Sequence, residues 1–190
     1  MKQEFITGNS IYLRRIETED LVGNYFNWFN DREVTRWTQH GIFPNTSQAM
    51  EKYYESVSHS KTDLVLAIIL QDDHRHVGNI GIHRIHPIFR SAEVGILIGE
   101  KDVWGQGIGT QSIQLMVSHA FLRLNLHRLY AGAVIKNLGC IRAFEKVGFI
   151  REGMARQAYF CEGEYLDCIN LSLLQSDWLM NRKSEGDRNL

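Results

Sequence analysis

Short apolar runs recur along the chain and predict the strands of a sheet. The strongest is DLVLAIILQ at 63–71, a continuous series of leucine and β-branched residues that is typical of a strand buried on both faces. Asp72 and Asp73 supply a turn after it, so the next run is expected to complete a hairpin. The other predicted strands are 10–16, 77–85, 91–100, 128–135, 149–160 and 164–174, the last two joined through Gly163.

Apolar residues three and four positions apart predict the helices. The clearest series follows Gly109 and consists of Ile113, Met116, Val117, Ala120, Phe121 and Leu124. We expect further helices from Thr18 to Phe29, from Thr46 or Ser47 through Val57, and over 137–147, where Gly148 ends the helix. The segment 31–45 has no clear period and predicts a loop, and 181–190 predicts a frayed tail.

The order of these elements predicts a mixed α/β fold. It runs strand, two helices, three strands, helix, strand, helix and two strands, which favours one sheet covered by helices. The chain has no internal repeat and no convincing linker. We therefore expect residues 1–180 to form a single domain.

Composition narrows the class of function. With 21 basic and 22 acidic residues the net charge is −1, so the chain has no basic field of the kind that nucleic-acid binding needs. No apolar run approaches the roughly 18–20 residues of a membrane span, and the N-terminus lacks the apolar core of a signal peptide. Three cysteines without C-x-x-C spacing fit a reduced compartment. We expect a cytoplasmic protein with no nucleic-acid or membrane partner.

The stretch VWGQGIGT at 103–110 carries three glycines on alternate positions between a predicted strand and a predicted helix. Glycines at a helix N-terminus let backbone N–H groups close around a phosphate, although a tight turn that needs positive φ would also use them. The dinucleotide pattern G-x-G-x-x-G is absent, and the Walker pattern needs a Lys where Thr110 stands. A pyrophosphate held by backbone alone is the remaining functional interpretation.

Two blocks carry a family resemblance. WGQGIGT before a long amphipathic helix resembles the acyl-CoA pyrophosphate loop of the GNAT superfamily of N-acetyltransferases, and Trp104 stands where most members have Gln or Arg. That replacement resembles the branch of ribosomal-protein N-terminal acetyltransferases. The second block, NLGCIRAFEKVGFIREG at 137–153, is similar to the family segment N-x-x-S-x-x-x-Y-E-K-x-G-F. The resemblance implies a single-domain GNAT fold whose mixed sheet has about seven strands, with helices on both faces.

The resemblance also implies acetyl-CoA as co-substrate. It places the pyrophosphate on the backbone at Gln106, Gly107, Ile108, Gly109 and Thr110, and the pantetheine arm along the strand at Ile96, Leu97 and Ile98. Asn137 would steady the cofactor, or it would cap the helix that follows it. Phe144 would pack on the cofactor arm.

Direct acyl transfer from sulfur to nitrogen needs a base, an oxyanion donor and a proton for the thiolate. The resemblance makes Glu93 the candidate base, unless it only pairs with Arg90 or Lys101, and it makes the N–H of Leu97 or Ile98 the oxyanion donor. Phe144 replaces the usual acid Tyr. The candidate acid is therefore Cys140, unless it is only a small buried residue, and Tyr159 and Tyr165 are held in reserve.

Four histidines lie close together in the sequence, at His74, His76, His83 and His86. His83 and His86 are three apart on a predicted strand and so point to opposite faces, which disfavours a shared metal site. We predict no metal. Either of these two histidines would instead suit an acceptor pocket. An aromatic row is expected mostly in the core, with some members walling the acceptor cleft; it consists of Tyr25, Phe26, Trp28, Phe29 and Trp37.

The acceptor is expected to be a primary amine. NWFNDREVTRW at 27–37 resembles a segment of relatives that acetylate nucleotide-linked amino sugars and ribosomal-protein N-termini, whereas FRSAEVGILIG at 89–99 resembles polyamine acetyltransferases. Basic residues interleave with the carboxylates of the first segment and would weaken their hold on a polyamine. We rank a protein N-terminal amine or an amino sugar above a polyamine. A non-catalytic acyl-CoA-binding domain is the alternative, and a homodimer is possible.

Overall fold

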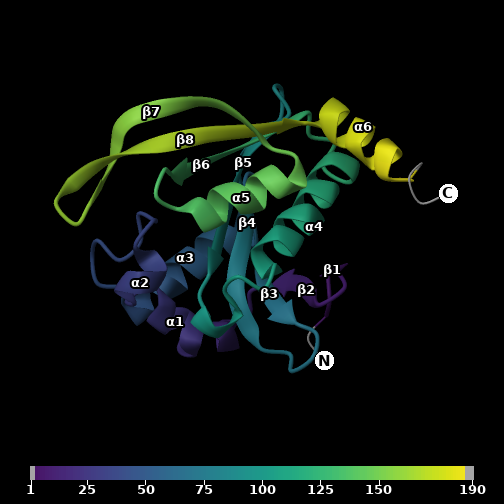
Figure 1. Cartoon of the computed structure of the whole chain (residues 1–190). Helices are drawn as coiled ribbons and strands as arrows, with labels where there is room; N and C mark the ends of the chain where they lie inside the picture. The colour runs from purple at the N-terminus through teal and green to yellow at the C-terminus, as the bar shows by residue number, and fades with distance from the viewer. Residues whose placement is uncertain (1–2, 187–190) are drawn as a thin grey trace.

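One eight-stranded sheet runs through the molecule in the order β1-β2-β3-β4-β5-β6-β8-β7 (Figure 1). The computed structural model describes residues 3–186. Neighbouring strands are antiparallel except β5 and β6, which are parallel, so the mixed sheet is confirmed with one strand more than expected. The strands are β1 Ile6–Thr7, β2 Ile11–Arg15, β3 Leu64–Leu70, β4 His76–His86, β5 Ser91–Ile98, β6 Arg128–Val134, β7 Ile150–Cys161 and β8 Glu164–Leu174.

Helices cover both faces of the sheet. They are the short 3-10 helices η1 Thr18–Val22 and η2 Lys101–Val103, and the α-helices α1 Asn24–Trp28, α2 Arg32–Thr35, α3 Ser47–His59, α4 Ile108–Leu122, α5 Leu138–Val147 and α6 Gln175–Gly186. The long amphipathic helix is confirmed as α4. Among the described residues, no helix has the length and apolar character that crossing a membrane requires.

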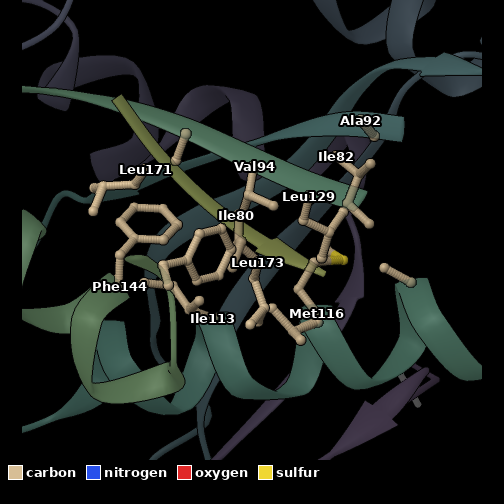
Figure 2. Close-up of a cluster of buried hydrophobic side chains, with 14 of the residues drawn as sticks. Ile80, Ile82, Ala92, Val94, Ile113, Met116, Leu129, Phe144, Leu171 and Leu173 are labelled. Atoms are coloured by element: carbon tan, nitrogen blue, oxygen red, sulfur yellow. The ribbon is translucent and has the colours of Figure 1, made fainter. Parts of the chain in front are cut away.

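Two hydrophobic clusters lie on opposite faces of the strands. Leu66 and Ile68 of β3 belong to the larger cluster with α4 and α5, and Ala67 and Ile69 belong to the smaller one with α1, α2 and α3. This alternation confirms that β3 is buried on both faces. Figure 2 shows part of the larger cluster, in which strand side chains meet α4 and α5 through Ile80, Ile82, Val94, Ile113, Met116 and Phe144.

The structure corrects three predicted elements. The helix expected from Thr18 to Phe29 is broken at Gly23, whose extended backbone separates η1 from α1. The loop expected over 31–45 contains α2, which begins because the Asp31 side chain accepts hydrogen bonds from the N–H groups of Glu33 and Val34. Helix α6 was not predicted, since Trp178 is its one side chain in the buried core among those described. It overlaps the tail expected at 181–190, of which 187–190 lie outside the described residues.

Strands β5 and β6 pair over only three positions, from Ser91 with Arg128 to Glu93 with Tyr130. Both strands continue beyond that point, β5 to Ile98 and β6 to Val134, while their outer edges remain paired with β4 and β8. The facing edges therefore diverge, and no ladder joins them there among the described strands. This splay opens the middle of the sheet.

Candidate active site

A cavity of about 540 Å³ occupies the splay between β5 and β6. It reaches from α5 on one face of the sheet to α1, α3 and the segment 37–40 on the other. Six of the residues predicted for the site line it, namely Glu93, Ile96, Leu97, Asn137, Cys140 and Phe144. The topology thus joins the predicted cofactor strand and the second sequence block around one opening.

The glycine stretch forms the N-terminal end of α4. Gly105 and Gly107 have φ of +77° and +83°, and a Cβ built on either meets no atom within 4 Å. The first helical bond that follows is donated by the Gln111 N–H to the Gly107 carbonyl, so the N–H groups of Ile108, Gly109 and Thr110 point out of the helix end. Positive φ, open space and outward N–H groups together fit a phosphate cradle.

This loop is held against β5. The Trp104 indole Nε1–H donates to the Ile98 carbonyl at 3.0 Å, and a Cβ on Gly109 would lie 3.9 Å from side-chain atoms of Ile96 and Ile98. The open edge of β5 therefore leads directly to the cradle. A ligand that combines an extended amide-bearing arm with a pyrophosphate fits this arrangement.

Helix α5 contributes the other wall. The Asn137 side chain accepts a hydrogen bond from the Cys140 N–H at 3.2 Å, so the capping role is confirmed while the same residue lines the cavity. Phe144 is buried and packs edge-on against Phe149. Burial raises the pKa of the Cys140 thiol to about 11, so this thiol stays protonated near neutral pH and is a weak acid.

Glu93 lines the cavity but its ion pair differs from the one expected. Its carboxylate pairs with Arg84 of β4. Arg90 instead donates to Asn125, and Lys101 pairs with Asp31 and Glu33 at 3.0 and 2.9 Å. The antiparallel register explains the difference, because it sets Glu93 opposite His83, next to Arg84.

Tyr165 is not brought to the cavity with Glu93 and Cys140. Its side chain is 66% exposed on β8 and packs against Phe160. Tyr159 lines the cavity instead, and its hydroxyl bonds to the carbonyls of Arg36 and Thr38. Burial raises the pKa of this hydroxyl. Strands β7 and β8 form a long arm, and the outer end of this arm meets the segment after α2 (Figure 1).

The first 60 residues form the wall on the other side of the cavity, and part of the aromatic row expected there lines it. The aromatic and histidine side chains there are Tyr25, Phe29, Trp37, His40 and Tyr53, joined by Asn79 and His83 from β4. Burial, followed by the charge of His83, lowers the pKa of His40, and burial raises that of Tyr53. Of the aromatic row, Tyr25, Phe29 and Trp37 line the cavity and Phe26 and Trp28 do not, which the helical spacing alone could not decide.

The other histidines have separate surroundings. His76 bonds to the Gly78 carbonyl and the Asn79 side chain, both at 2.9 Å, while the His86 ring stacks on Phe89. Across residues 3–186, no group of three or more side chains that could hold a metal ion occurs.

Comparison with known proteins agrees with this geometry. Residues 10–150 match the acetyltransferase (GNAT) domain, so the chain belongs to the GNAT acetyltransferase family. It is 28% identical over 179 residues to the "Probable N-acetyltransferase YjcK" of Bacillus subtilis, which covers 90% of this chain and 98% of that protein. It is 27% identical over 184 residues to the spermidine N(1)-acetyltransferase of Escherichia coli K12, covering 95% of this chain and 94% of the relative.

A solved structure gives the same result. The spermidine N-acetyltransferase of Vibrio cholerae, in complex with CoA and spermine, superposes with a TM-score of 0.82 at 25% identity over 90% of this chain and 99% of that one. The mixed α/β GNAT fold is thereby confirmed. The protein is an acetyltransferase that uses acetyl-CoA as co-substrate. The narrower resemblance to the ribosomal-protein branch stays a prediction.

Proposed function

We propose that the chain transfers the acetyl group directly to a primary amine that is held in the cavity. The acceptor molecule that carries this amine has few other positive charges. The cofactor enters from the α4 and α5 side and the acceptor from the side of α1 and α3. Gly107, Ile108, Gly109 and Thr110 hold the pyrophosphate through backbone N–H groups, and the edge of β5 from Ile96 to Ile98 pairs with the pantetheine arm. The open geometry of the α4 terminus supports this assignment. Gln106, expected in the same set, donates its N–H to the Val103 carbonyl at 3.4 Å instead.

The charge of the cavity carries the proposal for the acceptor. Among the described residues that line it, Glu93 is the only carboxylate, and its charge is balanced by Arg84. A polyamine has several cationic centres and needs several carboxylates to replace its hydration. The wall opposite Glu93 presents the aromatic side chains Tyr25, Phe29, Trp37 and Tyr53. A protein N-terminal amine or an amino sugar suits these surroundings better than a polyamine.

Polyamine acetylation is the second candidate, because similar proteins of Escherichia coli and Vibrio cholerae are named as spermidine acetyltransferases, and the Vibrio protein was solved with CoA and spermine. Glu33, Asp31 and Glu162 lie outside the cavity and already pair with Lys101 or Arg36. A polyamine would have to compete with these cations. We therefore keep it second.

Steady-state kinetics with matched acceptors test the order. Acetyl-CoA is held constant, and kcat/KM is measured for spermidine, a tripeptide with a free N-terminal amine, and a nucleotide-linked amino sugar. We expect the peptide or the sugar to exceed spermidine. A value for spermidine at least about a hundredfold above both others, which corresponds to roughly 2.7 kcal/mol in transition-state binding, would reverse the order.

A variant separates the two candidates further. Glu93→Gln removes the one carboxylate that lines the cavity among the described residues and leaves Arg84 without its partner. It should therefore raise KM for spermidine more than KM for the peptide. Glu55→Gln on α3 is the matched control, because that exposed carboxylate does not line the cavity. Equal losses of kcat/KM on all three acceptors would contradict the proposal that the charge of the cavity selects the acceptor.

A further inference from the structure

Asp63 and His83 form a linked pair at the edge of the cavity. The His83 Nδ1 lies 3.2 Å from the Asp63 Oδ1, and both side chains are about one-third exposed, at 32% and 29%. Asp63 stands at the end of the segment before β3, and His83 lies on the neighbouring strand β4. His83 itself lines the cavity.

The surroundings of Asp63 determine how the ring is protonated. Burial alone would raise the pKa of Asp63, but hydrogen bonds from Ser60, Thr62, the Arg84 N–H and His83 outweigh it and hold the pKa below its usual value. An ionised carboxylate only accepts hydrogen bonds, so the neutral imidazole must carry its hydrogen on Nδ1. The lone pair is then on Nε2.

Two glycines make room for this nitrogen. Gly81 and Gly95 are directly paired across β4 and β5, and a Cβ on Gly81 would lie only 2.5 Å from the His83 Nε2. A Cβ on Gly95 would lie 3.5 Å from the same atom. Both glycines line the cavity. Within residues 3–186, Nε2 has no hydrogen-bond partner, so its lone pair is available at the splay.

We propose that His83 is the general base that takes a proton from the acceptor ammonium, and that Asp63 is the residue that positions it. This inference rests on the proposed function and assigns the proton acceptor within it. Glu93 lies directly across the strand pair from His83. Because Arg84 neutralises that carboxylate, the imidazole is the better-placed base.

The proton balance is complete without another reagent. The His83 Nε2 takes one of the three protons of the ammonium, which frees the nitrogen lone pair. That lone pair forms the N–C bond to the thioester carbon, and the C–S bond breaks with its electron pair on sulfur. The second proton that nitrogen must lose ends on the thiolate, and His83 releases the first to solvent. The products are the N-acetyl amine, free CoA and one proton.

Charged groups on every neighbouring element act on this ring. Asp63 precedes β3, Arg84 follows on β4, Glu93 faces from β5, and His40 couples electrostatically from the segment after α2. Tyr53 of α3 is close enough for the Asp63 charge to raise its pKa, after the larger effect of burial. His83 acts in its neutral form, so turnover should fall on the acid side as the ring is protonated.

The test compares pH profiles of kcat/KM for His83→Gln, Asp63→Asn and Glu93→Gln, using the best of the three acceptors above. We expect His83→Gln to lose about a hundredfold at pH 7, and to approach wild type at high pH, where the amine is already neutral. Asp63→Asn should lose less, and Glu93→Gln should keep the acid limb. His86→Gln is the matched control, because this histidine stacks on Phe89 outside the cavity.

Two further measurements do not depend on that variant. In His83→Ala, added imidazole should raise the rate at least tenfold over the rate without it. In the wild type, the acid limb of the kcat/KM profile should lie at the same pH for acceptors whose amines differ in pKa. An unchanged acid limb in His83→Gln, or its loss in Glu93→Gln instead, overturns the inference. If the wild type binds CoA but acetylates none of the amines, the proposed function fails first.

Discussion

Arg14 and Asp20 form a buried ion pair that ties β2 to η1. The guanidinium contacts both carboxylate oxygens, at 2.6 and 2.7 Å. Burial would raise the pKa of Asp20, but hydrogen bonds from Arg14 and the Glu17 N–H, together with the charge of His76, lower it from 3.8 to about 2. The Asp20 carboxylate is therefore ionised in the folded protein near neutral pH.

This pair predicts a pH dependence of stability. The folded pKa lies below the unfolded one, so the stabilisation is fully present above about pH 4 and is lost as the pH falls through about 2. The contribution is about 2 kcal/mol for a shift of this size. Asp20→Asn should cost roughly 3–5 kcal/mol, because Arg14 is left as an unpaired buried charge. Urea unfolding at pH 7 and pH 3 measures both effects.

Asp73→Asn provides the control, because that carboxylate is 52% exposed beside Arg75. Its removal should change the free energy of unfolding by less than about 1 kcal/mol. A similar loss for both variants would show that burial of the Arg14 pair contributes nothing of its own.

At the scale of elements, a substitution at the start of α4 should weaken acetyl-CoA binding without preventing the protein from folding. A Cβ on Gly109 meets nothing closer than 3.9 Å, and its φ is not in the left-handed region, so Gly109→Val should fold. The larger side chain projects beside the outward N–H groups, where the pyrophosphate is proposed to lie. We expect acetyl-CoA affinity to fall at least tenfold, about 1.4 kcal/mol, by calorimetry.

Gly153→Val is the matched variant, since a Cβ there also meets no atom within 4 Å and the residue lies on β7, away from α4. It should bind acetyl-CoA as the wild type does. Unchanged acetyl-CoA affinity in a folded Gly109→Val protein would contradict the proposal that the backbone at the start of α4 binds the pyrophosphate.

Elements also show how far the sequence could be read. The glycine stretch and the Asn137 block are local patterns, because one strand, one turn and one helix fix their geometry, and they could be predicted. The acceptor wall could be predicted only as a set of aromatic candidates, since contacts such as that of Tyr159 with Thr38 join residues more than a hundred positions apart. Glu93 was placed on the right strand, but its partner depended on the register between β4 and β5. Helix α6 could not be predicted, because its sequence has few apolar residues at helical spacing.

At the scale of the whole molecule, the splay predicts that ligand binding raises thermal stability. A ligand that pairs with the edge of β5 and reaches the α4 terminus would occupy the α5 side of the 540 Å³ opening. CoA at a hundred times its Kd should stabilise the fold by about 2.7 kcal/mol. For a domain of this size that is a rise in Tm of roughly 5–10 °C, measurable by calorimetry. Gly109→Val should shift far less at the same CoA concentration.

The three-position contact between β5 and β6 has a consequence for local motion. Apart from it, the sheet is two separate ladders, β1 to β5 and β6 with β8 and β7. Amide hydrogens on the inner edges of the gap should therefore exchange with solvent faster than those of the outer edges. A bound CoA arm would act as a ninth strand on the β5 edge and slow that exchange there, leaving β6 unprotected. The enzyme would therefore have a fully paired β5 only while it holds its co-substrate, and the β6 edge would stay open in both states.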